Sequence, residues 1–369
     1  MKLLFFIHGL SGGGAERVLS TIASAFVDRG HSVRVVYTEY LKEKAYTIDS
    51  RIEEIQLFNV VRKKRFIERA FSAIVMKTKK YGKIRKQVSE YKPDVAISFL
   101  TQVNNDVIIS LIGKNVPLIV CEHSRFSRYY GIRTNFSRWL LYRFATAITV
   151  LTKKDYDGLT DKYSQIYYMP NPITIPENKG TMVQREKVVL AAGRVHDWYI
   201  KGFDNFLRCW GNIKDDYPGW VCRIAGHYSE EDLMSLKEVV PSESLERVEF
   251  LGFRDDVHEV MRGAEVFCLT SRVEGFGLVL AEAMTAGCCC VSFDVENGPS
   301  EIIEDGKSGL LVKNQDLKDL EQKLRLVMSN EELRHKYSNN APKSIERYSL
   351  SNTLDRWNML LMHVTGKSY

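Results

Sequence analysis

Two glutamates, Glu274 and Glu282, lie eight positions apart at the predicted start of an apolar helix. Glu282 falls inside this helix, and a carboxylate among apolar residues is costly unless hydrogen-bond donors, such as ribose hydroxyls, meet it. Phe276, Gly277 and Leu278 form the helix N-terminus, whose backbone amides attract phosphate. Glu274, just ahead of these amides, would reach a sugar attached beyond that phosphate. The segment therefore suits all three parts of a nucleotide-sugar.

Two cations follow Val188–Ala192, the first predicted strand of the second half of the chain. Arg194 comes directly after this strand, and Lys201 comes seven positions after the arginine. Together they could hold a diphosphate without a metal, the arginine as a fork and the lysine as a point charge. Two solvated surface cations would give the same pattern. No Asp-x-Asp follows the end of a predicted strand, and the cysteines lack ligand spacing, so we expect neither metal nor other cofactor.

The first half of the chain offers a glycine-rich turn and a histidine. The turn contains Gly12, Gly13 and Gly14 ahead of a helix, so its amides could face an anion, or its glycines could only allow close packing. Arg17 replaces the third glycine of a dinucleotide fingerprint, which disfavours a nicotinamide enzyme. His123 follows a predicted strand directly. At that place it could contact a substrate hydroxyl, or it could be structural.

Strand-like and helical patterns alternate along the chain, which predicts an α/β protein with two doubly wound parallel sheets. The apolar runs that predict strands are Leu3–His8, Ser32–Tyr37, Val95–Phe99, Leu118–Cys121, Ala147–Leu151, Ile166–Met169, Val188–Ala192, Val221–Ala225, Val248–Leu251, Val266–Thr270, Cys288–Phe293 and Leu310–Val312. A proline-rich stretch predicts a linker over 173–180, between domains over 1–172 and 181–349. Two such domains facing a cleft would hold two substrates and transfer a group between them.

Positive charge is concentrated in the first half of the chain. Residues 1–170 contain 28 Lys and Arg against 15 Asp and Glu, whereas the rest contains 24 against 31. The segment 62–92 contains 12 basic residues and only two acidic ones. Apolar residues recur among them at helical spacing: Phe66, Ala70, Phe71, Ile74 and Val75. Such a helix could lie on an anionic membrane, or pack on its own domain with a solvated basic face. We expect no nucleic acid partner, because no nucleic-acid-binding motif accompanies the charge.

The segment EGFGLVLAEAMTAG, with its two glutamates in an EX7E pattern, resembles the signature of retaining GT-B glycosyltransferases of family 4. The SGGGAER loop, EHS, the Gly-Arg…Lys-Gly-Phe-Asp stretch and NGP…DGKSGLLV resemble the family in the same order. The resemblance implies catalytic roles for His123 and Glu274. The donor-binding residues that it implies are Gly13, Gly14, Arg194, Lys201, Arg254, Phe276, Gly277, Leu278 and Glu282. One departure concerns the arginine-to-lysine spacing, which is five in the family and seven here.

The resemblance also implies two Rossmann-like domains, with residues 350–369 crossing back to the first. It implies metal-independent retaining transfer of a hexose or N-acetylhexosamine from a nucleotide-sugar, with UDP favoured and GDP possible. Within the family, the sequence most resembles enzymes that extend undecaprenyl-diphosphate-linked glycans in bacterial surface polysaccharide assembly. A cytoplasmic enzyme, peripheral on the inner face of the plasma membrane and acting on a lipid-linked glycan, is therefore expected. A nucleotide-sugar 2-epimerase and a non-catalytic sugar-nucleotide-binding module are the alternatives.

Overall fold

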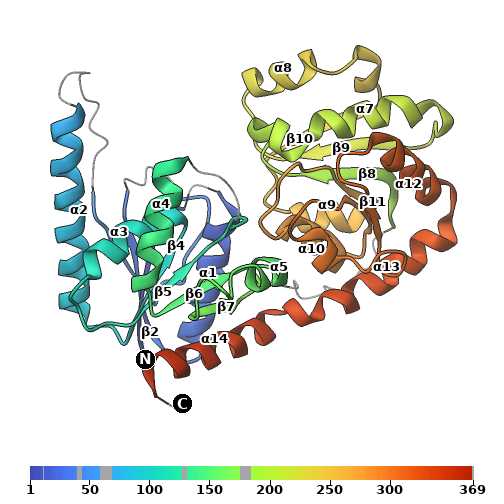
Figure 1. Cartoon of the computed structure of the whole chain (residues 1–369). Helices are drawn as coiled ribbons and strands as arrows, with labels where there is room; N and C mark the ends of the chain where they lie inside the picture. Colours follow the sequence, from blue (N-terminus) through green and yellow to red (C-terminus); the bar gives the residue numbers. More distant parts are fainter. Residues whose placement is uncertain (11, 40–43, 59–68, 127–130, 175–183, 368–369) are drawn as a thin grey trace. The chain divides into compact units, whose positions relative to one another are not determined.

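The computed structural model describes the chain except for residues 11, 40–43, 59–68, 127–130, 175–183 and 368–369. The chain forms two compact units, Met1–Pro172 with Leu350–Tyr369, and Ile173–Ser349 (Figure 1). Each unit is built on one sheet in which neighbouring strands run parallel. We call them the N-terminal and the C-terminal unit.

The N-terminal unit contains a seven-stranded sheet in the order β3-β2-β1-β4-β5-β6-β7. Its strands are β1 (Lys2–Ile7), β2 (Ser32–Tyr37), β3 (Glu53–Gln56), β4 (Val95–Phe99), β5 (Leu118–Cys121), β6 (Ala147–Val150) and β7 (Ile166–Tyr168). Its helices are α1 (Gly14–Asp28), α2 (Arg69–Tyr91), α3 (Thr101–Leu111), α4 (Ile132–Leu141), the 3₁₀ turn η2 (Tyr142–Phe144), α5 (Lys153–Asp157) and α14 (Leu350–Thr365).

The C-terminal unit contains a six-stranded sheet in the order β10-β9-β8-β11-β12-β13. Its strands are β8 (Glu186–Ala192), β9 (Val221–Ala225), β10 (Val248–Gly252), β11 (Ala264–Leu269), β12 (Cys289–Phe293) and β13 (Leu310–Val312). Its helices are α6 (Trp198–Lys201), α7 (Phe203–Ile213), α8 (Glu230–Glu238), α9 (Val257–Gly263), α10 (Leu278–Thr285), α11 (Pro299–Ile302), α12 (Leu317–Ser329) and α13 (Glu331–Ile345). The 3₁₀ turns are η3 (Val195–Asp197), η4 (Lys214–Asp216), η5 (Ser242–Leu245) and η6 (Glu346–Tyr348).

Both sheets are doubly wound, which fixes where ligands can bind. In each, the first strand is central, and the chain adds strands on one side before it crosses to the other. The order therefore reverses between β1 and β4 and between β8 and β11. Ligands of open α/β sheets bind beyond the carboxyl ends of the strands at this reversal. In the C-terminal unit the loops at this position are those that carry Arg194, after β8, and Glu274, after β11.

The interior strands are apolar along their whole length because helices cover both faces of a parallel sheet. All residues of β4 and β12 are buried, for example. Strand β3 was not among the predicted strands, because its sequence EEIQ is polar and shows no apolar alternation. It forms the sheet edge beside β2, where the Arg34 guanidinium lies 2.7 Å from the Glu53 carboxylate.

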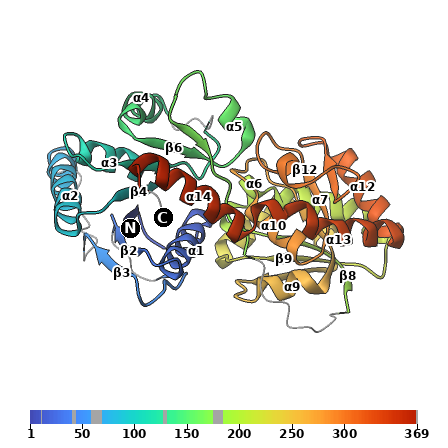
Figure 2. The same cartoon turned by 90° about the horizontal axis from the view of Figure 1, so that it is seen from below.

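The helix α14 belongs to the N-terminal unit, although it follows the C-terminal unit in the sequence. Figure 2 shows it beside α1. The Trp357 ring is buried and meets Phe26 of α1 edge to face, with ring centroids 6.2 Å apart. Arg29 also lies 3.0 Å from the carboxylate of Asp355. The apolar face of the last helix thus completes the core of the N-terminal unit.

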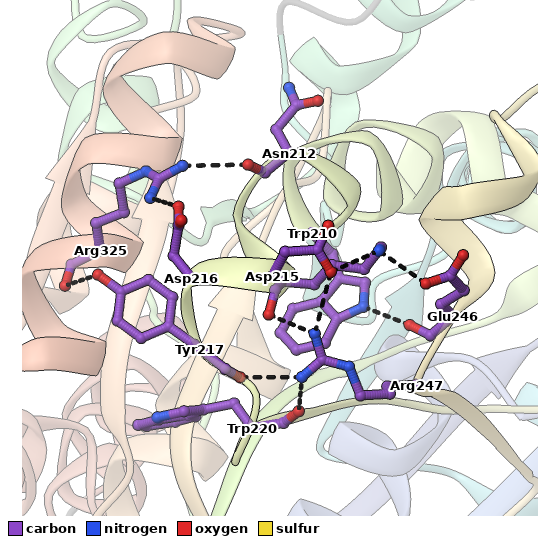
Figure 3. Close-up of polar contacts among 10 residues, drawn as sticks. Trp210, Asn212, Asp215, Asp216, Tyr217, Trp220, Glu246, Arg247 and Arg325 are labelled. Atoms are coloured by element: carbon purple, nitrogen blue, oxygen red, sulfur yellow. Dashed lines mark hydrogen bonds and ion pairs between the residues drawn. The ribbon is translucent and has the colours of Figure 1, made fainter.

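A polar network closes the amino edge of the C-terminal sheet (Figure 3). Arg247 donates to the carbonyls of Tyr217 at 2.9 Å and Trp220 at 3.1 Å, and also to that of Lys214. The Trp210 indole donates to the Glu246 carbonyl at 2.9 Å. These loops precede β9 and β10, whereas the candidate donor residues follow strands. The network is therefore structural and lies at the sheet edge opposite the candidate site.

Candidate active site

Lys201 and Glu274 meet at the carboxyl edge of the C-terminal sheet. The Lys201 Nζ lies 2.8 Å from Glu274 Oε1, and the Ser271 hydroxyl donates to the same oxygen at 2.6 Å. The side chains of Lys201 and Glu274 are only 19% and 9% exposed. The predicted phosphate cation and the predicted sugar-contacting acid are thus neighbours.

A close backbone approach brings these two residues together. Gly202 has a φ of +67°, and a Cβ at this position would lie 1.8 Å from the carbonyl oxygen of Thr270. The loop after α6 can therefore pack directly on the end of β11 only with glycine here. The Thr270 hydroxyl donates to the Gly202 carbonyl at 2.8 Å, and the amide of Arg272 donates to the Ile200 carbonyl at 2.8 Å. The contact fixes Lys201 opposite Glu274.

A second ion pair clamps the same two loops. Arg272 forms a bidentate contact with the buried Asp204 at the start of α7, at 2.7 and 2.8 Å. Its guanidinium also lies over the Tyr199 ring, 4.1 Å from the centroid. Our sequence analysis did not select Arg272, Asp204 or Ser271. The signal was present for two of them, because the sequence Ser-Arg directly follows a strand at the switch point.

Arg194 and Arg254 lie in loops after β8 and β10. The guanidinium of Arg194 is half-exposed and lies 2.7 Å from the carboxylate of Asp197 within η3. Arg254 makes a bidentate contact with Asp256, at 2.7 and 2.6 Å, and is also half-exposed. The longer spacing between Arg194 and Lys201 is taken up by η3 and the single turn α6. The two added residues therefore do not remove Lys201 from the end of β11.

The helix α10 begins at Leu278, and Gly277 is its N-cap residue with a φ of +91°. The Phe276 ring is buried against Tyr348, with centroids 5.2 Å apart, so this residue can offer a ligand only its backbone. Glu282 lies in the second turn of α10 and is half-buried. The predicted order of acid, helix N-terminus and second acid is thus realised on one loop and one helix.

The glycine-rich loop of the N-terminal unit is closed by a carboxylate of the chain itself. The amides of Gly12 and Gly13 donate to Glu16 Oε2 at 2.7 and 3.1 Å, and the His8 imidazole lies 3.1 Å from Oε1. Burial alone would raise the pKa of Glu16, but His8 and the two amides outweigh it and hold the pKa below its usual value. For these two amides, Glu16 occupies the position that an anionic ligand would take. Gly14 begins α1.

His123 lies just after the carboxyl end of β5 and stacks on Phe99 of β4. The ring centroids are 4.6 Å apart and the ring planes differ by 12°. Burial lowers the pKa of the His123 imidazole to about 3, and the side chain of Asn171 offsets this only in part. His123 is therefore neutral at physiological pH and can donate or accept one hydrogen bond without carrying charge.

A buried network holds the residue before it. The carboxylate of Glu122 accepts from the Thr101 hydroxyl at 3.0 Å and from the hydroxyl of Tyr142. Asn104 donates to the Cys121 carbonyl at 3.1 Å and to the Tyr142 oxygen at 3.0 Å. Burial raises the pKa of Glu122, and this is partly offset by the nearby cation and hydroxyl donors. This network, which the sequence analysis also missed, fixes the loop that carries the histidine.

Two further features of the described residues concern metal binding and membrane crossing. No three His, Cys, Asp or Glu side chains gather there into a possible metal site, and all seven cysteines are buried. Metal independence nevertheless stays a prediction. Across the same part of the chain, no helix has both the length and the apolarity that crossing a bilayer requires.

Two family models together cover most of the sequence. The model described as Glycosyltransferase Family 4 matches residues 12–175, and the model described as Glycosyl transferases group 1 matches residues 175–344. With the two Rossmann-like parallel sheets, these matches define the class as glycosyltransferases of GT-B fold. The chain belongs to this family.

Two relatives and two solved structures are similar to this chain over nearly its whole length. A Campylobacter jejuni GalNAc-alpha-(1->4)-GalNAc-alpha-(1->3)-diNAcBac-PP-undecaprenol alpha-1,4-N-acetyl-D-galactosaminyltransferase is 30% identical over 99% of both chains. The Erwinia amylovora amylovoran biosynthesis glycosyltransferase AmsD is 26% identical over 98% of this chain and 99% of its own. Anabaena HepE, solved with UDP and glucose, superposes with a TM-score of 0.79 at 19% identity, over 98% of this chain and 100% of its own. TarM superposes with a TM-score of 0.80 at 14% identity, over 99% of both chains. These two structures are similar in fold.

Proposed function

We propose that this glycosyltransferase moves a hexose or N-acetylhexosamine, with retention of configuration and without a metal, from a nucleotide-sugar to a polyprenyl-diphosphate-linked glycan. A UDP-sugar is the favoured donor and a GDP-sugar the second choice. The observation that carries the proposal is the contact between Lys201 and Glu274 beside the N-terminus of α10. The acceptor class is supported by the Campylobacter jejuni relative, whose name specifies an undecaprenyl-diphosphate-linked substrate.

The proposed roles follow from charge and position. Lys201 and Arg194 neutralise the charge that develops on the diphosphate leaving group, and the amides at the start of α10 add a fixed positive dipole. Glu282 accepts from the ribose hydroxyls. Glu274, held by Lys201 and Ser271, receives the hydroxyls of the transferred sugar.

His123 supplies a neutral hydrogen-bonding group from the N-terminal unit. Its lowered pKa keeps the imidazole uncharged over the working pH range, so it can contact a sugar hydroxyl without attracting the donor phosphates. Its stacking on Phe99 and the network around Glu122 restrict how far this ring can move. In this proposal Gly13 and Gly14 contribute to donor binding. They belong to the glycine-rich loop in which the amides of Gly12 and Gly13 donate to Glu16.

We also propose peripheral attachment to the inner face of the plasma membrane through the basic region 62–92. Within the described part of this region, the exposed cations are Lys77, Lys79, Lys83, Arg85, Lys86 and Lys92. Lys80 lies 3.0 Å from Asp106, and Lys83 donates to the Leu57 carbonyl. Lys80 and Lys83 therefore also have contacts within the N-terminal unit. A charge-reversal test should use Lys77→Glu with Lys79→Glu, which leaves the structural lysines in place.

The function is tested by incubating the full-length protein with UDP- and GDP-sugars and a polyprenyl-diphosphate-linked glycan. The expected result is a longer glycan together with release of the nucleotide diphosphate, and an NMR spectrum that shows the anomeric configuration of the donor kept in the product. A Glu274→Gln variant, which should bind UDP but transfer poorly, is the matched control. Epimerised donor without diphosphate release, or binding without any reaction, would overturn the proposal.

A further inference from the structure

The helix α4 turns its apolar side to solvent. Its residues and those of η2 that recur at spacings of three and four include five large exposed side chains: Ile132 (80% exposed), Phe136 (59%), Trp139 (48%), Leu140 (43%) and Phe144 (61%). The rings of Phe136 and Trp139 lie 5.7 Å apart. Helices of globular proteins normally show the reverse pattern, with the apolar stripe facing the core. We call these five residues the α4 patch.

Polar groups make many of the inward contacts of the same helix. Ser137 accepts from the Asn105 amide of α3 at 3.0 Å. Arg138 is buried, lies over the Phe126 ring at 4.1 Å and donates to the Phe126 carbonyl. Because these groups are engaged by the N-terminal unit, α4 cannot rotate to bury its apolar side without leaving them unpaired. Its exposed apolar side is therefore a fixed feature of the fold.

The sequence segment that contains the patch carries charge of one sign. From His123 to Lys154 the sequence contains five arginines and two lysines and neither Asp nor Glu. The exposed Arg143 guanidinium stands 5.0 Å from the centroid of the Trp139 ring. A tryptophan and an arginine side by side are typical of the water–lipid interface, where the indole lies at headgroup level and the cation meets lipid phosphate.

The patch and the basic helix α2 belong to one layer of the N-terminal unit. Neighbouring residues of α3 hold both: Asn105 bonds to α4 through Ser137, and Asp106 pairs with Lys80 of α2 at 3.0 Å. Both views show α4 next to α3 (Figures 1 and 2). Two forces attach a peripheral protein to a bilayer: burial of apolar side chains and attraction of cations to anionic lipid. The helix α4 offers the apolar side chains, and α2, on the other side of α3, offers exposed lysines.

We propose that the α4 patch inserts into the interface of an anionic lipid bilayer, with the aromatic side chains of Phe136, Trp139 and Phe144 among the acyl chain ends. This inference rests on the proposed lipid-linked acceptor and names the residues that contact its membrane. Eight residues separate His123 from Ile132, the first residue of α4. Insertion of the helix would therefore keep the proposed catalytic histidine close in sequence to the surface where a polyprenyl diphosphate is exposed.

A second copy of the chain is the other candidate occupant of an apolar patch. Charge favours lipid, because two copies meeting through the patch would bring together two segments that hold only cations. The same cations attract phosphatidylglycerol.

The test is flotation of the full-length protein with phosphatidylglycerol–phosphatidylethanolamine vesicles at 0.15 M salt. The variant that carries Phe136→Ser and Trp139→Ser should lose about tenfold or more in vesicle partitioning, because two large apolar side chains are removed from lipid. Its fold should persist, since both side chains are exposed. The matched control carries Met234→Ser and Met359→Ser, at residues 61% and 72% exposed on α8 and α14, and should bind like the wild type.

A second readout reports on insertion itself. Brominated lipids quench tryptophan fluorescence at short range, so Trp139→Phe should keep vesicle binding but lose a large part of the quenching seen in the wild type. Equal quenching in the two proteins would mean that Trp139 stays outside the bilayer, and would overturn the inference.

The remaining outcomes separate the inference from the proposed function. Wild-type protein that ignores the vesicles, or a Phe136→Ser/Trp139→Ser variant that binds as well as the wild type, overturns the insertion. So does a wild-type dimer, in sedimentation without lipid, that this variant converts to monomers. Transfer to a short water-soluble acceptor should survive in the variant. If the wild type transfers to no acceptor while the variant still loses vesicle binding, the proposed function fails and the insertion stands.

Discussion

The ion pair between Lys201 and Glu274 gives a quantitative test of the donor site. At 2.8 Å the gross attraction of two unit charges is roughly 6 kcal/mol at an effective dielectric constant of about 20. With side chains 19% and 9% exposed, the pair lies between two reference cases. Exposed pairs contribute about 0–1 kcal/mol, and removing one partner of a buried pair costs about 3–5 kcal/mol. We therefore expect Lys201→Met to lower the free energy of unfolding by about 2 kcal/mol.

This loss should be visible in the thermal unfolding of the full-length protein. For a unit of 150–250 residues, about 1 kcal/mol corresponds to roughly 2–4 °C in Tm, so Lys201→Met should lower the transition of the C-terminal unit by about 4–8 °C. The double variant Lys201→Met/Glu274→Gln should recover a large part of this loss, because it leaves no buried carboxylate without its cation. Lys343→Met, at an exposed position of α13, is the control and should change Tm little.

The same variant separates a structural from a ligand-binding role. If Lys201 contacts the diphosphate, Lys201→Met should weaken UDP binding in calorimetry by about 10- to 100-fold, the equivalent of one charged hydrogen bond of roughly 1.5–3 kcal/mol. Glu274→Gln should change UDP affinity by less than about threefold, because the sugar is absent. The reasoning is refuted if the single and double variants lose equal stability, or if Lys201→Met binds UDP like the wild type.

Four further predictions concern other parts of the site. Glu282→Ala should weaken UDP binding by about 10- to 100-fold through loss of the ribose acceptor, and unchanged affinity in calorimetry would exclude this role. Transfer should persist in EDTA; loss of activity that magnesium or manganese restores would contradict the metal-free phosphate site. The depressed pKa of Glu16 contributes stability above its usual pKa of 4.5, and this is lost as the pH falls through the lower folded value. The Tm difference between wild type and Glu16→Gln should therefore shrink from pH 7 to pH 3, and a constant difference would argue against the pairing with His8. Because the pKa of His123 is about 3, this residue should cause no inflection near pH 6.5 in the pH profile of transfer. An inflection near 6.5 in the wild type that is absent from His123→Asn would contradict this.

The fold was largely predictable because its strands are buried on both faces. Continuous apolar runs such as those of β1, β4 and β12 are strong local signals, and they alternate with helical patterns. The exception is β3, whose polar residues pair only at the sheet edge beside β2. A strand of this kind is specified by its neighbour and not by its own sequence, so a scan for apolar runs passes over it.

The position of a candidate residue in the fold was predictable where its type and its place after a strand coincided, as for Glu274, and its role stays a prediction. What a neighbouring loop contributes was not predictable. The glycine-rich turn suggested free amides, but Glu16 folds back onto two of them. This is the local contact of a helix capping box, which the sequence analysis did not weigh. By contrast, the carboxylate of Glu122 and the hydroxyl of Tyr142 meet only because β5 and η2 are brought together by the fold.

The two amphipathic helices show a second limit. Sequence periodicity finds an apolar stripe but does not say whether the stripe faces inward. For α2, Ile84 and Val88 form the buried side, whereas the predicted apolar residues from Phe66 to Ile74 lie outside the residues or side chains that the structure describes. For α4, the stripe faces outward, as the exposed residues of the α4 patch and the buried Arg138 show.

The interruption of the N-terminal unit by the C-terminal unit has a consequence for synthesis on the ribosome. Residues 173–349 form one contiguous unit whose ends are tied together, since Ile173 forms a parallel bridge with Ser349 and its amide donates to the Tyr348 carbonyl at 2.8 Å. This unit can fold as soon as it emerges. The sheet of the N-terminal unit is synthesised first, but its core is incomplete until Trp357 has been synthesised. At about 5–20 residues per second, this takes roughly 10–35 s more. During that interval Phe26 and its surroundings remain uncovered, so we expect nascent chains to be held by chaperones on this strip of α1.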